Sequence, residues 1–378
     1  MSDSDPFARL AGGVDGPSTR RVACGMLQRS PIDERHRALG AKMGAFAGWD
    51  MPISYAGTVK EHLAVRERVG LFDVSHLGKV LVRGTGAREF LDSQLTNRMA
   101  DLSPGRARYT LICDEEGGIV DDVIVYAVSD DELLVVPNAA NRDEVNARLA
   151  DGAPNGVTVE VLDWSTLAVQ GPSSPAVIAE LYPFAKDLKY MRVAREHDVV
   201  VSRSGYTGEV GYEVFTSAAD SSRAWGRLLD LVRAAGGEPC GLAARDTLRL
   251  EMGYPLHGND IDRQTTPAEA GLMWAVALEG RTFPGRDTVA TGSPRKMMIG
   301  LQMLDKLIPR KGQTILQGSD GIGACTSGTF SPVLRVGIAL GYVRPDLVTE
   351  GDEIEVDVRG KRGRARVHHP PFVDRSPK

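Results

Sequence analysis

Gly117-Gly118-Ile119-Val120-Asp121-Asp122-Val123-Ile124-Val125-Tyr126 is an apolar run that opens on two glycines and contains two adjacent carboxylates. The glycine pair predicts a hairpin turn, and the β-branched residues after it predict a strand. Because side chains alternate along a strand, Asp121 and Asp122 point to opposite faces, each among apolar neighbours. An ionised carboxylate is costly to bury without a partner. Either one aspartate has a chemical task, or one lies at the wet end of the strand and the other accepts backbone N–H bonds.

The elements around this strand predict an α+β architecture. Short strands alternate with helices from Arg108 to Leu149, and the order strand, glycine turn, strand, helix recurs from Val199 to Ala234. A polar segment with glycine and proline at 279–294 is expected to be a linker. Beyond it, short strands separated by glycines predict a small β-barrel or sandwich. Further helices are expected at 31–39, 58–69, 88–95 and 176–181, and further strands at 71–82, 133–136 and 157–169.

Length and composition limit the class of protein. The 378 residues predict two or three domains, and 42% hydrophobic with 25% charged residues is typical of a globular chain. A net charge of −5 argues against a nucleic-acid partner or an anionic membrane surface. No apolar run reaches the length of a transmembrane helix. The first 30 residues lack the apolar region of a signal peptide, so we expect a disordered leader on a cytoplasmic protein.

Common cofactor and metal motifs are missing from the sequence. The four cysteines are widely spaced and form no Cys-x-x-Cys pair, so no metal centre is predicted. Gly84-Thr85-Gly86 begins like a dinucleotide-binding loop but has Glu89 where the third glycine belongs. No P-loop, Gly-x-Ser-x-Gly or His-Glu-x-x-His motif is found. We therefore expect neither a resident nucleotide nor a metal ion.

A carboxylate and a guanidinium stand out among the remaining polar residues. Glu213 lies on a predicted covered strand, as Asp122 does, and Arg245 lies on a helix rich in small residues. Placed in one cleft, they would bind a flat heterocycle through two-pronged hydrogen bonds. Alternatively, Arg245 forms a structural ion pair with Asp246. The aromatic segment at 44–52 has little regular propensity and is either a buried loop or a pocket wall.

Taken together, the motifs resemble the T-protein, or aminomethyltransferase, family of the glycine cleavage system over nearly all of residues 31–373. The motifs are Leu39-Gly40-Ala41-Lys42-Met43, Phe46-Ala47-Gly48-Trp49-Asp50-Met51-Pro52, Phe72-Asp73-Val74-Ser75-His76, Gly117-Gly118-Ile119-Val120-Asp121-Asp122, Asn138-Ala139-Ala140-Asn141, Gln170-Gly171-Pro172, Ser204-Gly205-Tyr206-Thr207-Gly208-Glu209, Gly241-Leu242-Ala243-Ala244-Arg245-Asp246 and Thr326-Ser327-Gly328. They occur in the order that the family has.

The resemblance implies a fold and an activity. The fold is a three-domain cloverleaf around a central hole, with two interleaved α+β folate-binding domains at 31–290 and a C-terminal β-barrel at 295–378. The reaction moves a methylene group from the aminomethyl-lipoyl arm of the carrier H-protein to tetrahydrofolate, with loss of ammonia, and forms 5,10-methylenetetrahydrofolate. Tetrahydrofolate is then a co-substrate and lipoylated H-protein a partner, while no nucleic acid or membrane is involved.

The resemblance also implies roles for single residues. Asp122 matches the family's essential aspartate, near the reacting folate nitrogens N5 and N10. The other matching positions concern folate binding: Glu213 and Arg245 bind the pterin, Tyr109, Tyr206 and Tyr254 line the pocket, and Asn138 lies close to the folate. Asp121 is then the structural member of the aspartate pair.

Two related activities are alternatives. Folate-dependent demethylating domains accompany an FAD-binding Rossmann domain in the same chain, and none is visible here. A non-catalytic folate-binding protein of the same fold assists iron–sulfur assembly, but its Lys-Gly-Cys-Tyr-type motif is replaced here by Met252-Gly253-Tyr254-Pro255-Leu256. The basic run Arg359–Arg366 is either a solvated surface or a docking patch for the acidic H-protein.

Overall fold

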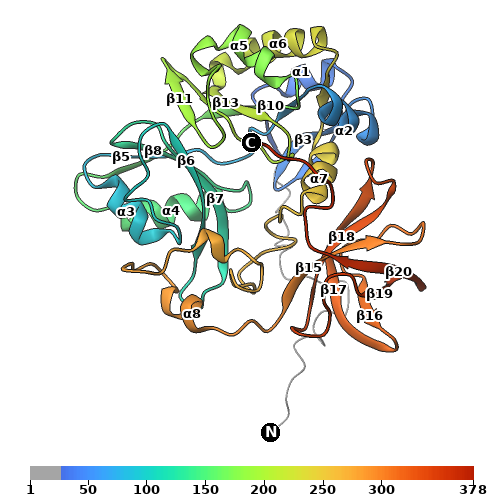
Figure 1. Ribbon diagram of the computed structural model, residues 1–378. Helices are drawn as coiled ribbons and strands as arrows, with labels where there is room; N and C mark the ends of the chain where they lie inside the picture. The colour runs from blue at the N-terminus through green and yellow to red at the C-terminus, as the bar shows by residue number, and fades with distance from the viewer. Residues whose placement is uncertain (1–26) are drawn as a thin grey trace.

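The computed structural model describes residues 27–378, which form three lobes that meet at the centre of the molecule (Figure 1). The predicted disordered leader at 1–30 lies outside the described residues except for its end. There the prediction is wrong: Gln28–Arg29 form strand β1, and Ser30 is buried and donates a hydrogen bond to Asp73. No helix in residues 27–378 is long and apolar enough to span a membrane.

The first lobe contains the strand that follows Gly117-Gly118 and carries the two aspartates. Its antiparallel sheet has the order β6-β7-β8-β5-β9, and helices α3 and α4 contribute to its core. The bounds are β5 (Val80–Arg83), β6 (Arg106–Cys113), β7 (Ile119–Ala127), β8 (Glu132–Val136), β9 (Thr158–Val161), α3 (Ala87–Gln94) and α4 (Arg142–Gly152). Val123 and Val125 of β7 belong to the core, whereas Asp122 and Ile124 line a cavity on the other face. The predicted alternation is confirmed from Asp122 to Tyr126, but Val120, which alternation would place on the face of Asp122, belongs to the same core cluster as Val123 and Val125.

The second lobe is built from chain segments on both sides of the first, as the interleaved fold requires. Its sheet has the order β11-β12-β13-β10-β4-β14. The bounds are β4 (Gly70–Asp73), β10 (Trp164–Gln170), β11 (Val193–Glu196), β12 (Val199–Ser202), β13 (Gly211–Ser217), β14 (Glu238–Cys240), α1 (Asp33–Ala38), α2 (Thr58–Glu67), α5 (Ser174–Leu181), η1 (Pro183–Ala185), α6 (Ala218–Ala234) and α7 (Leu242–Glu251). Helix α6 starts earlier than predicted because Ser217 caps it by accepting the backbone N–H of Asp220.

A small sheet in this lobe corrects the prediction for residues 44–52. Strands β2 (Lys42–Phe46) and β3 (Trp49–Ser54) form an antiparallel hairpin, and β1 pairs with the far edge of β3. Ala47 and Gly48 form the turn, with φ values of 47° and 83°. Two successive residues with positive φ make a turn whose twist suits a hairpin. The segment is therefore regular rather than an irregular loop.

The third lobe is a closed β-barrel, which confirms the predicted C-terminal architecture. Its order is β15-β18-β17-β16-β19-β20. The bounds are β15 (Met297–Met303), β16 (Thr314–Gln317), β17 (Asp320–Ser331), β18 (Val336–Val343), β19 (Glu353–Val358) and β20 (Lys361–His368). The preceding segment is more than a linker. It contains α8 (Arg286–Thr291), and the buried Arg281 forms an ion pair with Asp92 of α3.

Buried charges join the second lobe to the barrel. In helix α2, the apolar Val59 is half exposed and the charged Arg66 is buried. Arg66 Nη2 lies 2.8 Å from Glu251 Oε2 of α7, and Nη1 lies 3.0 Å from Glu209 Oε1. Glu251 Oε1 accepts a hydrogen bond of 2.5 Å from Ser331, at the end of barrel strand β17. Glu251 thus connects α2, α7 and the barrel.

We expect Glu251→Gln to lower the free energy of unfolding by about 3 kcal/mol at pH 7, because Arg66 would lose one of its two buried counter-charges. Burial acts to raise the pKa of Glu251, but His62 and Arg66 outweigh it and lower the pKa to about 2. The folded-state pKa lies below the unfolded one, so this stabilisation is complete above the unfolded pKa and is lost as the pH falls toward 2. Urea unfolding at pH 7 and pH 4 measures both effects.

The control for this prediction is Glu67→Gln, at an exposed position of α2 next to Arg66. It should change the free energy of unfolding by less than about 0.5 kcal/mol. Equal stabilities of the Glu251 and Glu67 variants at pH 7 would show that the buried ion pair does not hold the barrel in place.

Candidate active site

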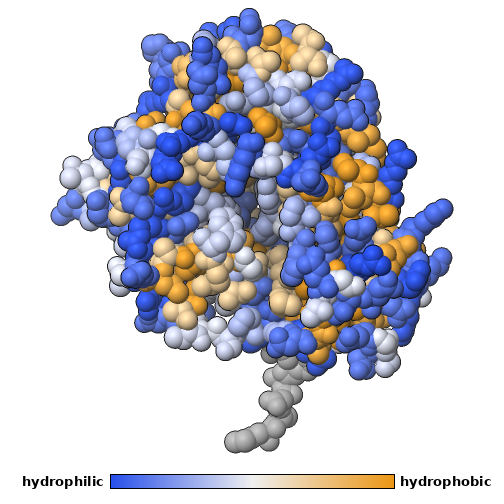
Figure 2. All heavy atoms as spheres, in the orientation of Figure 1, coloured by the Kyte–Doolittle hydropathy of each residue, from blue (hydrophilic) through white to orange (hydrophobic). Residues whose placement is uncertain are grey.

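A cavity of about 520 Å³ is lined by residues of the first two lobes and of the segment between α7 and the barrel, and Figure 2 shows the surface hollowed at the centre of the molecule. All seven residues that the sequence singled out for a site line this cavity. They are Tyr109, Asp122, Asn138, Tyr206, Glu213, Arg245 and Tyr254. Phe46 and Ala47 of the β2–β3 turn also line it, so the pocket-wall interpretation of residues 44–52 is confirmed.

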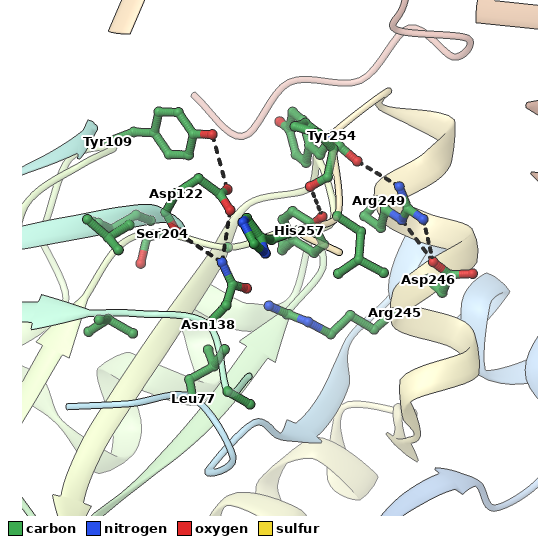
Figure 3. Close-up of a pocket in the computed structure, with 18 of the residues that line it drawn as sticks. Leu77, Tyr109, Asp122, Asn138, Ser204, Arg245, Asp246, Arg249, Tyr254 and His257 are labelled. Atoms are coloured by element: carbon green, nitrogen blue, oxygen red, sulfur yellow. Dashed lines mark hydrogen bonds and ion pairs between the residues drawn. The ribbon is translucent and has the colours of Figure 1, made fainter. Parts of the chain in front are cut away.

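Asp122 enters the cavity from β7 and is held by two hydrogen bonds (Figure 3). The Tyr109 hydroxyl donates to Asp122 Oδ2 at 3.1 Å, and Asn138 Nδ2 donates to Oδ1 at 2.8 Å. Asp121 points to the opposite face and is fully buried. It accepts three N–H bonds: 3.0 Å from the Asn138 backbone and 2.8 Å from each of the Asn138 and Asn141 amides. Asp121 therefore acts as a structural acceptor, and Asp122 is the carboxylate that a ligand can reach.

The two adjacent carboxylates affect each other's ionisation. Burial and the charge of Asp122 raise the pKa of Asp121 to about 8, against the hydrogen bonds from Asn138 and Asn141. Burial also raises the pKa of Asp122, while the hydrogen bonds from Tyr109 and Asn138 oppose the rise. Two neighbouring carboxylates repel each other when both are ionised, so they lose their protons in two separate steps. The pair therefore takes up a proton closer to neutral pH than an exposed aspartate does.

We expect the kcat of a reaction that depends on the Asp122 charge to fall as the pH drops below about 8. A proton taken up by the aspartate pair removes negative charge from this part of the cavity. Asp121→Asn removes the neighbouring charge, so Asp122 should ionise at lower pH and the acidic limb of the kcat profile should move to lower pH. A pH–rate series from about 5.5 to 9 measures the position of this limb independently of the absolute rate. A limb that stays in place would contradict the coupling.

Glu213 presents one oxygen to the cavity. It lies on β13, and its Oε2 accepts hydrogen bonds from the hydroxyls of Tyr126 at 2.8 Å and Ser204 at 2.7 Å. Both contacts within the described residues go to Oε2, which leaves Oε1 available to a ligand. The carboxylate is thus fixed by residues that do not themselves need to touch the ligand.

Arg245 extends from α7 into the cavity (Figure 3), and its guanidinium lies 4.8 Å above the centre of the Tyr206 ring. The alternative ion pair with Asp246 is wrong. Asp246 instead pairs with Arg249 at 2.8 Å. Within residues 27–378, Arg245 forms no ion pair, and its buried Nη1 has no hydrogen-bond partner. A buried guanidinium N–H without a hydrogen-bond partner is costly, so a ligand with suitable acceptors would be bound there.

Aromatic side chains cover the cavity. The rings of Tyr206 and Tyr254 lie 5.7 Å apart, and Trp274 stacks on Tyr109 at 5.1 Å. Trp274 belongs to the short helix η2 (Met273–Ala275) and is 67% exposed, so it can contact a ligand that protrudes from the cavity. Flat walls of this kind suit a planar ligand.

Sequence reasoning assigned no site role to four residues that line the cavity: Tyr126, Ser204, His257 and Trp274. Tyr126 had a signal, because it lies four residues after Asp122 on the same strand face. Ser204 begins one of the motifs quoted above. His257 and Trp274 lie outside strands and long helices, where no periodicity marks a side chain. In residues 27–378, no group of three His, Cys, Asp or Glu side chains could hold a metal ion.

Known proteins match this chain over almost its full length. The family model described as "GCVT N-terminal domain" matches residues 32–280, and "Glycine cleavage T-protein C-terminal barrel domain" matches 296–374. Proteins named aminomethyltransferase from Mycolicibacterium paratuberculosis and Parafrankia are 48% and 49% identical, covering 92% and 94% of this chain and 97% and 100% of the relatives. The crystal structure of glycine cleavage system aminomethyltransferase T from Bartonella henselae has a TM-score of 0.88 and 37% identity, over 93% of this chain and 99% of that one. The chain therefore belongs to the glycine cleavage T-protein family.

Proposed function

We propose that this chain, an aminomethyltransferase of the glycine cleavage T-protein family, uses Asp122 to transfer a methylene group to tetrahydrofolate. The donor is the aminomethyl group on the dihydrolipoyl arm of H-protein, and the products are 5,10-methylenetetrahydrofolate, ammonia and the free dithiol arm. One observation carries the proposal. A single cavity holds the Asp122 carboxylate together with Glu213 and the guanidinium of Arg245, whose buried Nη1 has no hydrogen-bond partner in the described residues.

The pterin ring fits the polar groups of this cavity. Its pyrimidine edge carries amino and ring N–H donors beside carbonyl and ring-nitrogen acceptors. Glu213 Oε1 can accept from the donors, and Arg245 can donate to the acceptors. Tyr126 and Ser204 keep the Glu213 carboxylate in one orientation, which reduces the cost of ordering it on binding. The aromatic walls contact the ring faces.

Asp122 is placed to assist the chemical step. As folate N5 attacks the methylene carbon and a leaving group departs, positive charge develops on an iminium-like carbon. A fixed carboxylate in a site shielded from water stabilises that charge. It can also accept a proton from N5 or N10 as the second carbon–nitrogen bond forms. The two folate N–H protons end on the leaving amine and thiolate, so the reaction balances without an oxidant or a metal.

The partner and cellular setting follow from this reaction. We infer a cytoplasmic protein that binds lipoylated H-protein and tetrahydrofolate, with no nucleic acid and no membrane.

The basic run at 359–366, one of whose two interpretations is a docking patch for H-protein, carries less unpaired positive charge than the sequence indicates. Three of its arginines pair with acidic side chains at Arg362–Glu355, Arg364–Asp305 and Arg366–Glu353. The domain limits at 31–290 and 295–378 remain predictions.

Ammonia release from aminomethylated H-protein, measured with and without tetrahydrofolate, tests the proposal. We expect release to be accelerated at least about 100-fold by tetrahydrofolate, with saturation as the folate site fills. The non-catalytic alternative makes the opposite prediction: folate binds, but the release rate does not change. H-protein that lacks the aminomethyl group is the blank for both arms.

A further inference from the structure

His257 lies in the loop between α7 and the barrel and contacts strand β7. Its Nε2 lies 3.2 Å from the carbonyl oxygen of Ile119, the first residue of β7, and its Nδ1 lies 3.0 Å from Nδ2 of Asn141. The loop itself is fixed, because Asp260 accepts the backbone N–H of Leu256 at 2.9 Å. The ring therefore bridges two elements that carry the aspartate pair and its partners.

These partners determine which nitrogen of His257 carries the proton. A carbonyl oxygen only accepts, so Nε2 carries the hydrogen, and an amide nitrogen only donates, so Nδ1 is the acceptor. The second hydrogen of Asn141 Nδ2 is donated to Asp121 Oδ1 at 2.8 Å. The opposite orientation of the Asn141 amide would set its oxygen against the Asp121 carboxylate and lose both bonds. His257 and Asp121 together therefore fix this amide.

A continuous series of hydrogen bonds leads from this amide to Asp122. Asp121 Oδ1 accepts from the amides of both Asn141 and Asn138, at 2.8 Å each. The same Nδ2 atom of Asn138 donates to Asp122 Oδ1 at 2.8 Å and to the Asp122 carbonyl oxygen at 3.0 Å. Figure 3 shows Asn138 reaching Asp122 from the side opposite Tyr109. The orientation of the Asp122 carboxylate thus depends on a series of hydrogen bonds that begins at His257.

We propose that His257 is a positioning residue for Asp122, acting through Asn141, Asp121 and Asn138. The inference rests on the proposed role of Asp122 in methylene transfer. Without the imidazole, Asn141 loses its acceptor and can turn away from Asp121. The carboxylate of Asp122 then loses a fixed orientation, which lowers the rate of the chemical step more than it lowers folate affinity.

The variant His257→Leu tests this role. We expect kcat for tetrahydrofolate-dependent transfer to fall by about 10- to 100-fold, while KM for tetrahydrofolate stays within about twofold. His257→Asn places a side-chain oxygen near the former Nδ1, where it can accept from Asn141, so it should recover most of the rate. The double variant His257→Leu with Asn141→Ala should be no slower than Asn141→Ala alone, because both changes interrupt one series of contacts.

His369→Leu, at an exposed position, is the matched control and should keep the wild-type rate. Retained folate binding, followed by protein fluorescence, establishes that the His257 variants fold around an intact cavity. The inference is overturned by an unchanged kcat in His257→Leu, by a loss that lies in KM, or by a His257→Asn variant as slow as His257→Leu. Failure of the proposed function looks different, because wild-type protein itself would then show no tetrahydrofolate-dependent ammonia release.

Discussion

Asp122→Asn is expected to lower kcat by about 10²- to 10⁴-fold while leaving the affinity for tetrahydrofolate almost unchanged. The amide keeps the size of the side chain and can still accept from Tyr109 or Asn138, so the cavity should stay intact. It carries no negative charge, however, and therefore does not stabilise the positive carbon. Steady-state ammonia release measures kcat, and fluorescence titration with tetrahydrofolate measures the affinity.

Asp130→Asn, at an exposed position, is the control for removing one negative charge from the protein and should leave both quantities unchanged. Unchanged turnover in Asp122→Asn would remove this residue from the mechanism. A loss of folate affinity as large as the loss of rate would instead assign it to binding.

Arg245→Met is expected to weaken tetrahydrofolate binding by about 100-fold, which corresponds to one or two lost hydrogen bonds to a charged group at about 1.5–3 kcal/mol each. The methionine side chain can occupy the space beside Tyr206 but offers no donor to the pterin. Arg245→Lys should bind nearly as weakly, because an ammonium group cannot reproduce the planar arrangement of donors. Equilibrium dialysis gives Kd, and kcat at saturating folate should change little.

Arg233→Met, at an exposed position of α6, is the control for loss of one positive charge. An unchanged Kd in Arg245→Met would mean that the pterin lies elsewhere. A full recovery of affinity in Arg245→Lys would indicate that the site recognises charge alone rather than the edge of a planar ring.

The strand around Asp122 could be predicted because the alternation that marks a strand is visible within a few neighbouring residues. Alternation of apolar side chains placed Asp122 and Tyr126 on one face, and the structure has them there. The hairpin β2–β3 was missed for an equally local reason. Its turn uses Ala47, a residue without the usual preference for positive φ, and Pro52 within β3 argues against a strand.

Contacts between distant residues could not be predicted from periodicity. The buried side of α2 carries Arg66, which is stabilised by Glu209 and Glu251, more than 140 positions away in the sequence. A pattern of apolar residues does not reveal such partners. The partner of Asp246, in contrast, could have been predicted from helix geometry. Residues i and i+1 of a helix do not face each other, whereas i and i+3 do, so Arg249 fits Asp246 better than Arg245 does.

The position of His257 required the tertiary structure. It lies in a loop, and its two partners, Ile119 and Asn141, belong to the first lobe, more than 110 positions away in the sequence. The residues that could be identified from sequence are those within motifs, such as Glu213 and Arg245. The residues that orient them had to be read from hydrogen bonds.

The most direct test is a single-turnover transfer from H-protein that carries an isotopically labelled aminomethyl group. With wild-type protein and tetrahydrofolate, we expect the label in 5,10-methylenetetrahydrofolate, in an amount equal to the ammonia released. With Asp122→Asn, bound folate should stay unlabelled over the same time. Transfer of the label by Asp122→Asn at the wild-type rate, or ammonia release by the wild type with no label in the folate, would contradict the assignment of this cavity as the site of methylene transfer.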